Sequence, residues 1–161
     1  MPKKTADAII CACDEILDNK FIDQFITDSI QGGAGTTFNM NVNEVIANRA
    51  TEILGGKKGE YLCHPNDHVN CAQSTNDVIP TAGKLTVLQL SKALFENLDE
   101  LIGALSKKAV EFDGIIKMGR TQLEDAVPIR LGQEFAAYAS SLERAKARIK
   151  ATLSEMYVVN L

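Results

Sequence analysis

Two long runs of apolar residues at helical spacing constrain the fold of this chain most strongly. Within each run, the apolar residues follow one another at intervals of three or four positions, which is typical of helices in bundles and coiled coils. The first run is Val87, Leu90, Leu94, Leu98, Leu101 and Leu105, and the second is Phe135, Tyr138, Leu142, Ala145, Ile149, Leu153 and Met156. Two such helices cannot bury both of their apolar faces against each other alone when the rest of the chain is small. We therefore predict an all-α protein whose long helices need partner helices from other subunits or from further chain.

Shorter patterns surround these two helices. The sequence predicts helices over residues 5–17, 21–30 and 39–54, and two long helices that begin near residues 74 and 132. Gly55 and Gly56 suit the end of the third helix. Glycines and Pro128 mark an irregular segment near residues 113–130 that could contain short β-strands. We divide the chain into a first domain of residues 1–73 and a helix-bundle domain of residues 74–161.

Composition narrows the function classes. The formal net charge of −4 argues against nucleic-acid binding, which usually requires a basic face. No apolar run is long enough to span a bilayer, and no apolar stretch of a signal peptide follows Lys3 and Lys4. We therefore expect a cytoplasmic protein without a membrane partner, whose four cysteines are reduced thiols.

Three small polar segments stand at the edges of the predicted helices. They are GGAGTTFNMNVNE (Gly32–Glu44), QSTND (Gln73–Asp77) and GRTQLEDA (Gly119–Ala126). Each offers hydroxyl and amide groups with little net charge. Such groups can donate hydrogen bonds, so the sequence predicts that the three segments form one site for a small carboxylate.

Each segment also has a purely structural interpretation. The glycine-rich segment can form a backbone nest for an anion, with Thr36 and Thr37 as added donors, or a simple turn. Ser74, Thr75 and Asn76 can bind a carboxylate at a helix N-terminus or merely cap that helix. In the third segment Arg120 could orient a carboxylate, but it is expected to pair with Glu124 or Asp125.

Four possible zinc ligands cluster in the connector between the helices. Cys63, His64, His68 and Cys71 are ligand types that zinc prefers. Their spacing is not that of a usual zinc finger, and no CxxC motif is present. Zinc binding is therefore a minor alternative, and no metal or cofactor is expected.

Long blocks of the sequence resemble the aspartase/fumarase superfamily, and within it the aspartate ammonia-lyases. The blocks are GAGTTFNMNVNEVIANRATEILGG, HPNDHVNCAQSTNDVIPTA and KMGRTQLEDAVPIRLGQEF. The resemblance extends from about Ala8 to Leu161. It implies a long-helix bundle of the L-aspartase type, a homotetramer, and elimination of ammonia from L-aspartate to give fumarate.

The resemblance also implies roles for individual residues. Thr36, Ser74 and Thr75 would hold the β-carboxylate of the substrate. Asn76 and Thr121 would lie near its amino group, and Gln122 stands where fumarases carry histidine. In fumarases, the loop corresponding to His64, Asn66 and Asp67 forms a second anion site.

The sequence lacks one block of this superfamily. The loop GSSxMPxKxNP, whose serine removes the substrate proton, does not occur in these 161 residues. We therefore expect an internal segment of a lyase that is inactive alone. Fumarate hydratase or another lyase of the superfamily is one alternative, and a non-catalytic helical assembly module is another.

Overall fold

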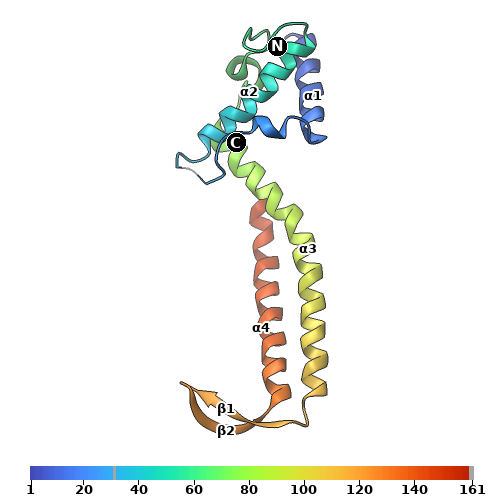
Figure 1. Cartoon of the computed structure of the whole chain (residues 1–161), viewed down its shortest axis with the longest axis vertical. Helices are drawn as coiled ribbons and strands as arrows, with labels where there is room; N and C mark the ends of the chain where they lie inside the picture. Colours follow the sequence, from blue (N-terminus) through green and yellow to red (C-terminus); the bar gives the residue numbers. More distant parts are fainter. Residues whose placement is uncertain (31, 160–161) are drawn as a thin grey trace. The chain divides into compact units, whose positions relative to one another are not determined.

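The computed structural model describes residues 1–30 and 32–159 as helices with one β-hairpin (Figure 1). The helices are α1 (Lys3–Leu17), α2 (Thr36–Ile53), α3 (Thr75–Glu111) and α4 (Leu131–Thr152), and the strands are β1 (Ile116–Thr121) and β2 (Glu124–Arg130). Three short helical turns cover Ile22–Gln24, Pro65–Val69 and Leu153–Tyr157. The predicted all-α class with a short β segment is confirmed.

The chain forms two compact units, Met1–Ala82 and Gly83–Val158, whose boundary lies inside α3. The division into domains of residues 1–73 and 74–161 stays a prediction.

The core of the first unit lies between α1 and α2. Ala8 and Ala12 of α1 are buried together with Ile46 and Ala50 of α2. The small alanine side chains let the two helices approach closely, so little space is left between them. Cys63 completes this cluster, and burial raises the pKa of its thiol.

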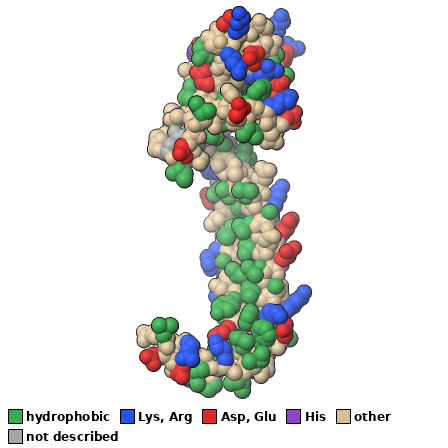
Figure 2. Space-filling view, viewed as in Figure 1, with side chains coloured by type: hydrophobic (Ala, Val, Ile, Leu, Met, Phe, Trp, Pro, Cys, Tyr) green, Lys and Arg blue, Asp and Glu red, His purple; other side chains and the backbone are tan. Residues whose placement is uncertain are grey.

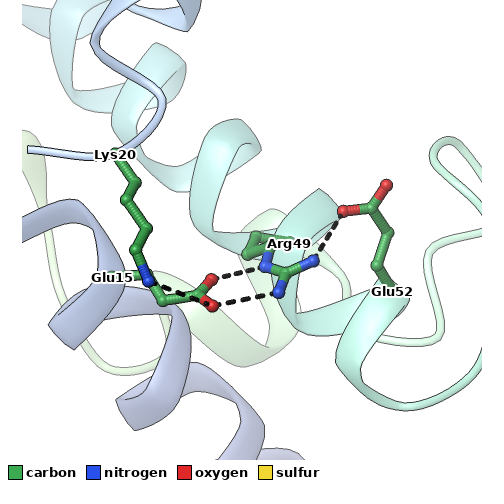
Figure 3. A network of polar contacts seen from close by, with 4 residues as sticks. All are labelled: Glu15, Lys20, Arg49 and Glu52. Carbon is green, nitrogen blue, oxygen red and sulfur yellow. Dashed lines mark hydrogen bonds and ion pairs between the residues drawn. The ribbon is translucent and has the colours of Figure 1, made fainter.

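An ion-pair network ties the same two helices together (Figure 3). Arg49 of α2 donates through Nε and Nη2 to the two carboxylate oxygens of Glu15 on α1, at 2.5 and 3.0 Å. Its Nη1 donates to Glu52 at 3.2 Å. The two parallel hydrogen bonds fix the orientation of the pair as well as its distance. These hydrogen bonds from Arg49 lower the pKa of the Glu15 carboxyl below its ordinary value.

The lowered pKa of Glu15 predicts a pH dependence of stability. The pair stabilises the fold above the pKa of Glu15 in the unfolded chain, about 4.3, and this contribution disappears as the pH falls through the lower folded pKa. We expect Glu15→Gln to lower the thermal midpoint at pH 7 and to reduce its further fall below about pH 4.5. Circular dichroism melts of both proteins from pH 3 to pH 7 measure this effect. Parallel pH curves for the two proteins would contradict it.

Two details of the first unit differ from the prediction. The expected helix over residues 21–30 is reduced to the turn Ile22–Gln24, because the backbone leaves helical angles at Phe25, where φ is −86° and ψ is 79°. Helix α2 begins at Thr36, three residues before the predicted start at Asn39. The glycine-rich segment therefore ends in the first turn of a helix.

In the second unit, α3 and α4 run antiparallel and the β-hairpin connects them (Figure 1). Gly132 of α4 lies so close to α3 that an added Cβ would stand 2.3 Å from the carbonyl oxygen of Ala109. Next to this contact, the rings of Phe112 and Phe135 meet edge to face, with centroids 5.2 Å apart. The ion pair of Lys146 with Asp99 joins the two helices further along.

Large apolar side chains remain exposed along these two helices. Figure 2 shows hydrophobic side chains gathered over the paired helices. The exposed residues of the two predicted runs are Val87, Leu90, Leu94, Leu101, Tyr138 and Ile149. As predicted, α3 and α4 do not cover each other's apolar faces. None of the helices in the described residues is both long enough and apolar enough to cross a bilayer.

Candidate functional site

The N-termini of α2 and α3 lie together in the first unit. Gly35, just before Thr36, has a φ of 84°, a left-handed angle that favours glycine. A Cβ on Gly35 would stand 2.9 Å from a side-chain carbon of Ile79, which lies one turn beyond Thr75 in α3. Two separate features favour glycine at position 35: its left-handed backbone angle and the close approach of Ile79. The contact brings the start of α2, with Thr36, beside the first turns of α3.

Ser74 and Asp77 cap helix α3 reciprocally. The Ser74 hydroxyl accepts from the backbone N–H of Asn76 at 3.3 Å, and the Asp77 carboxylate accepts from the N–H of Ser74 at 3.0 Å. This arrangement is similar to a capping box, with aspartate in place of the usual glutamate and the Ser74 hydroxyl bonded to the second helical N–H instead of the third. The structural interpretation of Ser74 is therefore correct for the free chain. Ser74 remains exposed, so the cap does not exclude a ligand.

Thr75 belongs to a network of side-chain amides behind the two N-termini. Its hydroxyl oxygen accepts from Nδ2 of Asn39 at 3.0 Å. Nδ2 of Asn39 and Nδ2 of Asn43 also lie 3.4 and 3.1 Å from Oδ1 of Asn70. Asn39 and Asn43 are only 3% and 6% exposed. The position of the Thr75 hydroxyl is thus determined by buried groups of α2.

The three asparagines were not predicted from the sequence, although a signal existed for two of them. Asn39 and Asn43 are four residues apart, so they share one helix face, and Ile46 and Ala50 continue that buried face. A polar residue on an apolar helix face needs a hydrogen-bond partner. That need could have indicated a polar site beside α2, although not the identity of its partner Thr75.

The histidine loop forms one compact π-helical turn at Pro65–Val69. Nδ1 of His64 accepts from the backbone N–H groups of Asn66 and Asp67, at 3.3 and 3.2 Å. Nδ1 of His68 accepts from the N–H of His64 at 2.8 Å. The structure thus brings together His64, Asn66 and Asp67, the residues of the expected second anion site. Their role in binding an anion stays a prediction.

The same loop offers no zinc site. Across the described residues, no group of three or more His, Cys, Asp and Glu side chains is placed to hold a metal ion. Cys63 is buried in the core, where its backbone N–H donates to Thr51, whereas Cys71 is exposed. The zinc alternative therefore lacks a common site for these four side chains.

Thr121 and Gln122 lie at the tip of the β-hairpin, in the second unit. Thr121 ends β1 and pairs with Glu124, so Gln122 and Leu123 form a two-residue turn. Both turn residues have positive φ angles, 48° and 65°, as in the turns that suit two-residue hairpins. The predicted pairing of Arg120 with Asp125 is confirmed. Both Thr121 and Gln122 are exposed, and their side chains form no hydrogen bond within the described part of the chain.

The candidate residues of the first unit are neutral hydrogen-bond donors. Thr36, Ser74 and Thr75 carry hydroxyls, and Asn76 carries an amide. Two helix N-termini add backbone N–H groups and a positive local potential. Such a set can bind a carboxylate and stabilise negative charge that develops on it.

Comparison with known proteins identifies the family. A family model described as Lyase matches residues 1–161. Aspartate ammonia-lyase of Bacillus subtilis (strain 168) is 57% identical over 155 residues, which cover 96% of this chain and 33% of that protein. Aspartate ammonia-lyase of Escherichia coli (strain K12) is 50% identical over 163 residues, which cover 100% of this chain and 34% of that protein. The chain thus spans about a third of the length of these relatives.

Solved structures agree with these relatives in fold. The crystal structure of fumarate lyase:delta crystallin from Brucella melitensis in native form has a TM-score of 0.85 and 51% identity, and covers 100% of this chain and 38% of that chain. The class II fumarase from Schistosoma mansoni has a TM-score of 0.82 and 40% identity, and covers 97% of this chain and 33% of that chain. The match to the whole chain, together with these folds, shows that this protein belongs to the lyase family that this model describes.

Proposed function

We propose that the protein carrying this sequence is an aspartate ammonia-lyase, and that this chain supplies part of its carboxylate-binding site. One observation supports the proposal most directly. The neutral donors Thr36, Ser74 and Thr75 stand at two neighbouring helix N-termini, in a chain 50–57% identical to aspartate ammonia-lyases. A site of this kind suits a dicarboxylate substrate whose negative charge grows during the reaction.

In the proposed reaction, a base removes a proton from C3 of L-aspartate. The electron pair that remains delocalises into the β-carboxylate and gives an aci-carboxylate with additional negative charge. Thr36, Ser74 and Thr75 would bind this group and stabilise its charge through hydrogen bonds that are already oriented. The C–N bond then breaks, the electron pair forms the double bond of fumarate, and ammonia leaves.

The remaining residues have supporting roles in this proposal. Asn76 would lie near the leaving amino group, where its amide oxygen can accept a hydrogen bond. The resemblance assigns Thr121 to the same group, and Gln122 to the position where fumarases carry histidine. The resemblance assigns the base to the serine of a GSSxMPxKxNP loop, which is absent from these 161 residues. We accordingly expect no turnover from the 161-residue chain alone.

We also propose that the protein is a cytoplasmic homotetramer. The exposed apolar side chains of α3, such as Leu90 at 65% and Leu94 at 44%, support an assembly in which further helices cover them. Sedimentation of the complete gene product tests the assembly. A monomer at micromolar concentration would contradict it.

The class II fumarase match favours fumarate hydratase as the second candidate function. The two candidates are separated by assaying the complete gene product for ammonia release from L-aspartate and for hydration of fumarate. Our proposal predicts that only the first reaction proceeds at an enzymatic rate. Hydration of fumarate without ammonia release would establish the alternative.

A protein that only assembles would give neither reaction. It would also show no rise in thermal midpoint with aspartate or fumarate, because only a ligand that binds the folded state stabilises it, by RT ln(1 + [L]/Kd).

A further inference from the structure

The buried Asn39 has no place in the proposed site, yet it contacts that site directly. It is the fourth residue of α2 and only 3% exposed. Its Nδ2 lies 3.0 Å from the Thr75 hydroxyl oxygen and 3.4 Å from Oδ1 of Asn70. A buried amide must satisfy its hydrogen bonds within the protein, so this contact is a fixed part of the structure.

A backbone carbonyl determines the direction of every hydrogen bond in this network. Asn70 lies with its Nδ2 3.2 Å from the carbonyl oxygen of Gln73. A carbonyl can only accept, so the amide nitrogen of Asn70 must face Gln73 and its Oδ1 must face α2. Asn39 and Asn43 both approach that Oδ1, and both must therefore donate to it through Nδ2.

The orientation of Asn39 in turn determines that of Thr75. Because Asn39 presents its NH₂ group to Thr75, the threonine oxygen accepts this hydrogen bond and its own hydrogen points elsewhere. The Thr75 hydroxyl donates no hydrogen bond within the described residues. Its hydrogen remains available for an acceptor that comes from outside the chain, such as a carboxylate oxygen.

We propose that Asn39 is a positioning residue that holds the Thr75 hydroxyl as a hydrogen-bond donor toward the substrate carboxylate. This inference rests on the proposed function, since it assigns the ligand of Thr75 to the substrate. Without Asn39 the Thr75 hydroxyl could rotate, and its hydrogen could point in other directions. If the hydroxyl that donates to a charged carboxylate is no longer held in place, binding would weaken about 10-fold.

Asn43 provides a matched control for this inference. It also donates to Oδ1 of Asn70, at 3.1 Å, but forms no hydrogen bond to Thr75. In either alanine variant, Oδ1 of Asn70 keeps one donor, so the two variants differ in whether the hydrogen bond to Thr75 is lost. We expect Asn39→Ala to lower kcat/KM for L-aspartate about 10-fold in the complete gene product, and Asn43→Ala to lower it less than about 3-fold.

A double-mutant cycle separates positioning from a structural role. If Asn39 acts through the hydroxyl, Asn39→Ala should change kcat/KM less than about 2-fold in a Thr75→Val background. An equal loss in both backgrounds would overturn the inference, and so would equal losses for the two asparagine variants. Should Asn39→Ala fail to fold, the cycle is run with Asn39→Ser, which weakens the same hydrogen bond, and the same outcomes apply.

Binding of succinate distinguishes a failure of this inference from a failure of the proposed function. Calorimetry measures succinate affinity without turnover. If the protein releases no ammonia but binds succinate, and Asn39→Ala weakens that binding only when Thr75 is present, the proposed activity fails and the inference stands. If ammonia is released but the cycle is additive, the activity stands and the inference fails. If wild type neither binds succinate nor turns over aspartate, both fail.

Discussion

Replacing Thr75 by valine is expected to lower kcat/KM for L-aspartate about 100-fold in the complete gene product. Valine keeps the shape of threonine and removes only the hydroxyl. That hydroxyl accepts from Asn39 at 3.0 Å, so its hydrogen is directed away from the buried network. Removing one donor that is already oriented toward developing negative charge costs about 100- to 1,000-fold in rate in other enzymes.

The loss should concern the reaction more than the fold. Asn39 loses one acceptor in Thr75→Val but keeps its second contact, with Asn70. The variant is therefore expected to assemble and to melt within a few degrees of wild type. Thr75→Ser retains the hydroxyl and should recover most of the activity. Steady-state assays of ammonia release compare the three proteins, and a Thr75→Val variant with more than about a third of wild-type kcat/KM would contradict the role.

A second large effect is expected where Gly132 of α4 approaches α3 in the second unit. Gly132→Ala should destabilise the fold by about 2–3 kcal/mol, because the added methyl group would overlap atoms that cannot rotate away. Its Cβ would lie 2.3 Å from the carbonyl oxygen of Ala109, and 2.8 and 2.9 Å from Cα and N of Asp113. All three are backbone atoms of α3 or of the turn that follows it. The helices would have to separate where Phe112 and Phe135 are in contact.

Gly103→Ala is the matched control for this substitution. Gly103 lies inside α3, and a Cβ there meets nothing within 4 Å. The same chemical change should stabilise that helix by up to about 1 kcal/mol, because alanine loses less backbone freedom on folding than glycine. Urea unfolding followed by circular dichroism compares the two variants. A midpoint for Gly132→Ala at or above that of wild type would show that the two helices do not approach as closely as described.

Periodicity predicted the long helices well because one physical pattern controls both their sequence and their packing. Helices α1, α3 and α4 appear where apolar residues recur at three or four positions. The helix expected at residues 21–30 failed because the backbone leaves helical angles at Phe25, where ψ is 79°. Phe25 is neither glycine nor proline, so the residue type did not indicate that the helix ends there.

The candidate site was predictable only in part, for a similar reason. The position of Ser74 at a helix N-terminus follows from local sequence, since serine is a preferred capping residue. Thr36 was expected in the glycine-rich segment ahead of the helix, and α2 instead begins at Thr36. The contact of Asn39 with Thr75 joins residues 36 positions apart, and no local pattern specifies it. Sequence reasoning could therefore propose which groups donate, but not which buried groups orient them.

The central claim is that a dicarboxylate binds where the N-termini of α2 and α3 meet. A crystal structure of the complete gene product with bound succinate tests it most directly. We predict one carboxylate within about 3.2 Å of the Thr75 hydroxyl oxygen and of at least one of the Thr36 and Ser74 hydroxyls. A succinate bound elsewhere, with the Thr75 hydroxyl turned toward Asn39 or toward water, would contradict the account.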